Sequence, residues 1–231
     1  MRRKHLPFVL FICVLAILII CDTYNCIDSY VAQIIMYIGI NIILTASLNL
    51  VNGYMGEFSV GHAAFMAVGA YAASFFSLSM FPQTPAFFPL SLIIGGIFAG
   101  AVGLLVAIPA FKARDDYLAI ITLALLMIVK SAFDNLPFFG GPQGYYGIHK
   151  YTSLSWVFVW AVITVVVLRN LVYSNFGRGI IAVRDDEIAA NLVSVDTRQV
   201  KILAFVIGMA GTIGVKAHCW HGAWLKRGRH S

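Results

Sequence analysis

The chain has 231 residues, of which 60% are hydrophobic and 11% are charged, and its formal net charge is +6. Its apolar runs approach the roughly 20 residues that cross a bilayer as a helix, which predicts an all-α, polytopic membrane protein. The runs are continuously apolar, which excludes a membrane-spanning β-barrel. Most lysines and arginines lie in short loops, where they indicate membrane topology rather than nucleic-acid binding.

A window of about 19 residues predicts seven membrane segments, at residues 6–21, 31–51, 61–81, 87–110, 117–136, 154–168 and 202–215. The basic start of the chain predicts a cytoplasmic N-terminus, and alternation then places residues 52–60, 111–116 and 169–201 inside. These inside regions hold seven lysines and arginines, whereas the outside loops hold only Lys150, as the positive-inside rule requires. No small-residue cleavage site follows the first run, so we expect it to stay as a helix.

Residues 49–65, NLVNGYMGEFSVGHAAF, join the second and third segments and are rich in glycine and polar side chains. Irregular backbone at membrane depth is tolerated only where it is buried in protein or lines a cavity, and broken helices mark transport pathways. A structural hydrogen bond explains His62 as well as a pathway role does, and Glu57 is predicted to be a solvated loop carboxylate. The candidate pathway residues are Asn49, Asn52, Gly53, Gly56, Ser59, Gly61 and His62.

Small residues recur four positions apart within two predicted segments. Gly69 and Ala73 lie in the third segment, and Gly95, Ala99 and Gly103 lie in the fourth. Such faces let helix backbones approach closely. They predict tight helix packing, with a subunit interface around a pathway as the alternative.

The most polar stretch of the chain is FGRGIIAVRDDEIAANLVSVDTRQVKILAF, residues 176–205. Acidic residues from Asp185 to Glu187 stand where a helix would begin, which suits the positive end of the helix dipole. The residues that follow favour or tolerate a helix, so we predict a short amphipathic helix of about three turns. A solvated loop has no need for a smooth surface at Ala189 and Ala190 flanked by charge, and this surface predicts close docking of a partner.

Together with DDYLAIITLALL (115–126) and GGPQGYYGI (140–148), these stretches resemble the inner-membrane permease subunits of ABC transporters that import branched-chain amino acids. The resemblance covers most of residues 30–208. In such permeases an E-x-A-A segment is the coupling helix, which rests in a groove of the ATPase subunit. Ser194 stands where the family pattern usually carries glycine. The resemblance assigns to ATPase coupling the residues Arg178, Arg184, Asp185, Asp186, Glu187, Ala189 and Ala190.

The resemblance implies a subunit of an ATP-driven importer of branched-chain amino acids, or of a related substrate such as urea or amides, that is not an enzyme and needs no cofactor. No GxxxxGK[ST] motif occurs in the chain, so two separate ATPase subunits would bind ATP. Further implied partners are a second, different permease subunit, a periplasmic or extracellular substrate-binding protein and the lipid bilayer of the bacterial inner membrane. An ion-coupled secondary transporter would need mid-span carboxylates, which are missing.

We expect one transmembrane permease domain, residues 1–215, with a cytoplasmic loop at 169–201 and an atypical basic tail at 216–231. Four basic residues of this tail would lie outside, against the positive-inside rule, and relatives continue with further membrane helices. An inactive, truncated or frame-shifted copy is therefore an alternative expectation. Neither the four cysteines nor the histidines of the tail have the spacing of a metal site, and no catalytic residues are predicted.

Overall fold

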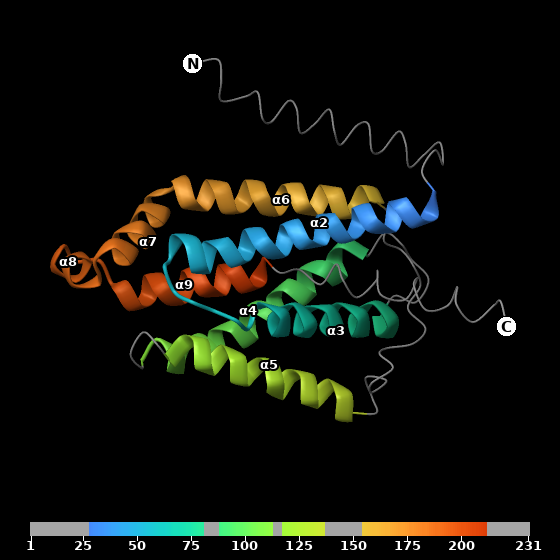
Figure 1. Cartoon of the computed structure of the whole chain (residues 1–231), viewed down its shortest axis with the longest axis horizontal. Coiled ribbons are helices and arrows are strands. Elements are labelled where there is room, and N and C mark those ends of the chain that lie inside the picture. Colours follow the sequence, from blue (N-terminus) through green and yellow to red (C-terminus); the bar gives the residue numbers. More distant parts are fainter. Residues whose placement is uncertain (1–27, 81–87, 113–116, 137–153, 212–231) are drawn as a thin grey trace, which may run out of the picture.

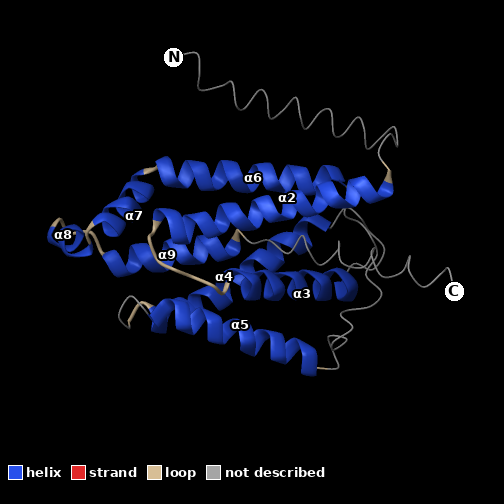
Figure 2. Cartoon of the chain, in the orientation of Figure 1, coloured by secondary structure: helices blue, strands red, loops and turns tan. Residues whose placement is uncertain are grey.

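The computed structural model describes residues 28–80, 88–112, 117–136 and 154–211. Every regular element in these ranges is a helix, as Figure 2 shows, which confirms the predicted all-α fold. In chain order the elements are α2 (Ser29–Asn49), the π-helix η1 (Leu50–Tyr54), α3 (His62–Met80), α4 (Phe88–Ala110), α5 (Tyr117–Asn135), α6 (Leu154–Tyr173), α7 (Asn175–Asp185), α8 (Glu187–Leu192) and α9 (Thr197–Ala210).

Helices occupy six of the seven predicted membrane segments, and the first predicted segment, residues 6–21, lies outside the described residues, as does the tail. Over the described residues, four helices are long and apolar enough to cross a membrane: Tyr30–Tyr54, Pro89–Ala110, Leu118–Asn135 and Leu154–Tyr173. The count of seven spans stays a prediction.

The regions predicted to lie inside gather at one end of the helix bundle. Figure 1 shows the C-terminal ends of α2 and α6, the whole of α7 and α8, and the start of α9 at this end. The regions 52–60, 111–116 and 169–201 all contribute to the lining of one small cavity there, which includes Glu57, Phe111, Glu187 and Lys201. The alternation of the predicted segments therefore agrees with the arrangement of the helices.

The small residues of α3 and α4 lie in the contact between these two helices. A Cβ atom added to Gly69 would lie 3.1 Å from the carbonyl oxygen of Gly95 and 3.4 Å from the Cβ atom of Ala99. Farther along α4, a Cβ atom at Gly103 would lie 3.1 Å from the side chain of Met209 on α9. The predicted close packing of helix backbones is confirmed.

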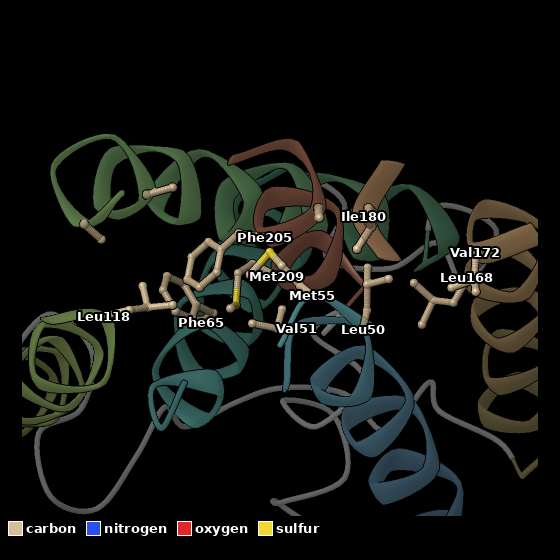
Figure 3. Packing of buried hydrophobic residues seen from close by; sticks show 13 residues of the cluster. Leu50, Val51, Met55, Phe65, Leu118, Leu168, Val172, Ile180, Phe205 and Met209 are labelled. Carbon is tan, nitrogen blue, oxygen red and sulfur yellow. The ribbon is translucent and has the colours of Figure 1, made fainter. Parts of the chain in front are cut away.

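One cluster of buried apolar side chains is formed by η1, the starts of α3 and α5, the C-terminal ends of α4 and α6, α7 and the C-terminal half of α9 (Figure 3). At its centre the ring of Phe205 meets the rings of Phe65 and Phe111 edge to face, at centroid distances of 5.7 Å and 5.8 Å. Edge-to-face contact between aromatic rings stabilises the fold in addition to the removal of their apolar surface from solvent. This core anchors η1 and α9 against each other, and both carry candidate functional residues at their ends.

Candidate functional site

Three side-chain caps divide residues 174–197 into helices. The hydroxyl oxygen of Ser174 accepts a hydrogen bond from the backbone N–H of Gly177 at the start of α7. One carboxylate oxygen of Asp186 accepts from the backbone N–H groups of Ile188 and Ala189, at 2.9 Å and 3.0 Å, at the start of α8. At the start of α9, a carboxylate oxygen of Asp196 accepts a hydrogen bond from the backbone N–H of Gln199 at 3.0 Å. Such caps satisfy donors that a helix start leaves free.

The predicted helix of about three turns is therefore wrong in its extent. Asp186 leaves the helical conformation, with φ −158° and ψ 109°, so α7 ends before it and α8 begins after it. Helix α8 has only six residues, and the eleven-residue α7 precedes it. Figure 1 shows both helices at the tip of the molecule, joined at an angle.

Helix α8 turns apolar side chains outward. The side chains of Ile188, Leu192 and Val193 are exposed, with 76%, 84% and 75% of their surface accessible, whereas Ala190 is buried at 3%. The predicted smooth surface of two alanines is thus wrong for Ala190, because α8 contacts α7 and α9 and turns this residue toward them. Ala189 is exposed, as predicted.

Ser194 closes the turn after α8 in the left-handed conformation, with φ 63°. A side chain in this region crowds its own backbone, which is why glycine is the usual residue there. The departure from the family pattern at this position has a clear physical meaning: the turn is formed, but the serine strains it.

A buried lysine joins the two candidate sites. The Nζ atom of Lys201 lies 2.8 Å from a carboxylate oxygen of Glu57 and 2.8 Å from one of Glu187. Lys201 and Glu57 are buried, so the expectation that Glu57 is a solvated loop carboxylate is wrong. Burial lowers the pKa of Lys201, but the hydrogen bonds to Glu187 and Glu57 outweigh it and hold the pKa above its usual value.

Arg184 makes a second connection between the same regions. Its guanidinium donates a hydrogen bond to the carbonyl oxygen of Gly53 at 3.3 Å and pairs with Asp185 at 2.9 Å. Its side chain also covers Gly56, where an added Cβ atom would lie 2.6 Å from its Cγ atom. Gly56 has φ 78°, so glycine suits it in both conformation and space. Arg178, in contrast, bonds locally to Asn175.

The candidate pathway residues shape an irregular segment after η1. The side-chain oxygen of Asn52 accepts a hydrogen bond from the backbone N–H of Ser59 at 3.2 Å, and Val60 donates to the hydroxyl of Thr122 on α5 at 3.3 Å. Gly61 lies so close to Thr122 that an added Cβ atom would meet its backbone oxygen at 2.8 Å. His62 is buried at the start of α3.

Asn49 is the last residue of α2, and a Cβ atom added to Gly53 would collide with its side-chain oxygen. Asn49 lines a cavity of about 300 Å³ between the ends of α2 and α6, together with Tyr54, Arg169 and Tyr173. The structure thus brings one coupling candidate, Arg184, together with Gly53 and Gly56, and Asn49 lies against Gly53. In the described part of the chain no group of three or more His, Cys, Asp or Glu side chains could hold a metal ion.

Comparison with known proteins agrees with this arrangement. The sequence profile of the family described as "Branched-chain amino acid transport system / permease component" matches residues 30–215. The chain belongs to this permease family. This family is a component of transport systems and not a family of enzymes, and the described residues include four helices long and apolar enough to cross a membrane.

Individual relatives carry the same description. The permease is 29% identical over 218 residues to the high-affinity branched-chain amino acid transport system permease protein LivM of Escherichia coli, an alignment that covers 75% of this chain and 49% of that protein. For LivM of Salmonella typhimurium the identity is 28%, with the same coverage. The probable branched-chain amino acid transport permease protein LivM of Methanocaldococcus jannaschii is 26% identical, over 78% of this chain and 64% of that protein.

The permease therefore spans about half the length of the first two relatives. No solved structure matches it significantly. Sequence reasoning missed Lys201 as a member of the site, since it was counted only among the topology-setting charges. The signal that could have found it is a lysine four positions before the buried Phe205, on a helix face that continues with the apolar residues Ala204 and Met209.

Proposed function

We propose that this chain is the permease subunit of an ATP-driven importer of branched-chain amino acids, and that α8 is its contact with a separate ATPase subunit. The family match and the names of the relatives support the substrate class. The observation that carries the coupling role is the outward display of Ile188, Leu192 and Val193 at the tip of the molecule.

An exposed apolar patch with a charged rim is typical of a protein interaction site. The apolar side chains of Ile188 and Leu192 in α8, and of Val193 directly after it, stand in the sequence between the acidic residues at the start of α8 and Arg198 at the start of α9. Contact of these apolar side chains with water is unfavourable, whereas an apolar groove in a partner would remove their surface from water. Ala189 lies on the exposed side and lets the partner backbone approach.

The mechanism follows from the separation of tasks between subunits. Two ATPase subunits bind and hydrolyse ATP, and their closure moves the coupling helices of two different permease subunits. This movement rocks the permeases against each other and alternates access to a shared pathway. A substrate-binding protein on the outer face delivers the amino acid, and the N-terminus and α8 lie on the cytoplasmic side.

The pathway itself is proposed to run past the irregular segment after η1. Residues Asn52 and Ser59 hold this segment in shape through their hydrogen bond, and Gly53, Gly56 and Gly61 allow close backbone approach. Polar, non-helical backbone of this kind is stable at membrane depth when protein surrounds it. Asn49 lies against Gly53, and His62 is buried at the start of α3.

The test begins with the full chain, its partner permease and the ATPase subunits in proteoliposomes. We expect leucine uptake that requires ATP and the ATPase subunits. Uptake driven by an ion gradient without them would overturn the proposed function.

A variant of α8 tests the contact. Leu192→Glu places a charge in the apolar patch, and we expect it to lower the amount of ATPase retained in a pull-down at least about tenfold, because a buried unpaired charge is costly. Tyr173→Glu is the matched control, since Tyr173 is 77% exposed at the same end but outside α8. Equal retention by both variants would show that α8 is not the contact.

A further inference from the structure

The buried ion cluster at Lys201 joins three separate parts of the chain. Glu57 lies in the irregular segment 55–60 before α3, Glu187 is the first residue of α8, and Lys201 lies in the second turn of α9. Both carboxylates are 2.8 Å from the same Nζ atom. Any rotation or shift of α8 that keeps this cluster intact must therefore move Lys201 and Glu57 with it.

The cluster is asymmetric in its exposure. The side chains of Lys201 and Glu57 are 8% and 9% exposed, whereas that of Glu187 is 39% exposed. The charge of Lys201 therefore stabilises the buried carboxylate of Glu57, while water can solvate Glu187 where it stands. The deep pair, Lys201 and Glu57, forms the fixed part of the connection, and Glu187 attaches the outer helix to it.

A second contact runs between the same two regions. The guanidinium of Arg184, at the end of α7, donates to the carbonyl oxygen of Gly53 in η1. Two contacts prevent free rotation about either one, so the junction of α7 and α8 is tied to the segment that includes η1 and residues 55–60. A small cavity of about 70 Å³ beside Glu57, Glu187 and Lys201 leaves room for adjustment.

Stability alone does not explain a buried ion cluster. Removing two charges from water costs about as much as their attraction returns, and apolar side chains of similar volume often serve as well. Hydrogen-bonded ionic groups hold two segments in one specific geometry, whereas segments joined by an apolar contact can slide past each other. An ion cluster is therefore suited to connect the movement of one segment to that of another.

We propose that Lys201 is a positioning residue that couples the position of α8 to that of residues 55–60. In the importer, a displacement of α8 by the ATPase would be carried through Lys201 and Glu57 to the segment that holds the candidate pathway residues. The transport consequence rests on the proposed function, whereas the mechanical connection is a property of this chain alone.

The first experiment tests the connection in the purified full chain without an ATPase. Glu57→Gln combined with Lys201→Met removes the bridge without leaving a buried charge, so the protein is expected to fold. We expect hydrogen exchange of backbone amides in residues 55–60 and in α8 to rise together, about tenfold or more. Arg198→Met is the control, since Arg198 lines the same cavity on the same helix. A rise in only one segment, or in neither, overturns the proposal.

The second experiment separates positioning from structure. In proteoliposomes with the ATPase subunits, we measure ATP hydrolysis with and without substrate-binding protein loaded with leucine. The double variant is expected to retain the ATPase in a pull-down but to lose the stimulation, so that the ratio of the two rates falls to about one. The single substitution Lys201→Arg keeps the positive charge and leaves Glu57 in place. It is expected to retain most of the stimulation that the unaltered chain shows. An unchanged ratio in the double variant overturns the proposal.

The two experiments fail in different ways. If the unaltered chain neither retains the ATPase nor imports leucine with ATP, the proposed function is wrong, and the exchange experiment still decides the connection. If the unaltered chain does both and the double variant shows normal stimulation, the proposed function stands and the role of Lys201 is wrong.

Discussion

Replacement of Gly95 by alanine tests the close contact of α3 and α4. The added Cβ atom would lie 2.5 Å from the carbonyl oxygen of Gly69 and 3.0 Å from the Cβ atom of Ala73. Ordinary contact begins at 3.4 Å, so the two helices must separate by about 0.9 Å at this point. Neither neighbour can move aside alone, because one is backbone and the other is a single methyl group.

The expected cost of Gly95→Ala is about 1–3 kcal/mol of unfolding free energy, the range for overpacking a filled contact. The matched control lies on the same helix. A Cβ atom at Gly100 would lie 3.4 Å from the Cβ atom of Ala210 and 3.7 Å from Val206, which is ordinary contact. Gly100→Ala should therefore stabilise the protein by about 0.5–1 kcal/mol, because alanine loses less backbone freedom in a helix.

The assay is unfolding of the purified protein in detergent, followed by loss of helical circular dichroism with heat or denaturant. The opposite signs of the two substitutions are the diagnostic result, since a general effect of alanine would move both the same way. If Gly95→Ala is as stable as the unaltered protein or more so, the close backbone contact of α3 with α4 is refuted.

Three other substitutions have expected outcomes in the same unfolding assay. Lys201→Met should cost about 3–5 kcal/mol because it leaves Glu57 buried without its lysine, and adding Glu57→Gln should recover most of the loss; the reverse order of stability would contradict the buried pair. Ser194→Gly should stabilise by about 1 kcal/mol, since glycine adopts the positive φ without strain, and a loss of stability would contradict it. Asp186→Ala should lower the unfolding free energy by about 1 kcal/mol, because α8 loses its N-terminal cap. An unchanged unfolding midpoint would contradict this role of Asp186.

The Lys201 contribution also has a defined pH dependence. The folded protein holds the pKa of Lys201 above its ordinary value, so folding favours the protonated lysine. The stabilisation is fully present below the ordinary lysine pKa of about 10.4 and declines only as the pH rises through the higher folded value. Unfolding at neutral and mildly alkaline pH should therefore show no loss from this group.

The helices were predictable from the sequence because their signals are local. An apolar run such as residues 88–110 needs no knowledge of its neighbours to be recognised as a membrane helix. The four-residue spacing of Gly95 and Ala99 likewise defines one face of one helix, and the structure places that face against α3. The start of α9 was predicted five residues late, because hydropathy does not report a capping residue such as Asp196.

The site was predictable only in part because its decisive contacts are between distant segments. Glu57 stands between polar and glycine residues, which is typical of a solvated loop, and its partner Lys201 lies in another helix of the bundle. Nothing in the residues around either one reports the other. The same holds for Arg184, which the resemblance assigns to ATPase coupling and which the structure also bonds to Gly53 of η1.

The second alanine of the pattern E-x-A-A is predicted from the sequence to belong to a docking surface, but the structure buries it within the protein. Glu187 is held by Lys201, and Ala190 is buried at 3% where α8 contacts α7 and α9. A larger side chain at position 190 would lift α8 and draw Glu187 away from its lysine. The small residue therefore belongs to the seating of α8, and Ile188 and Leu192 face outward because Ala190 faces in.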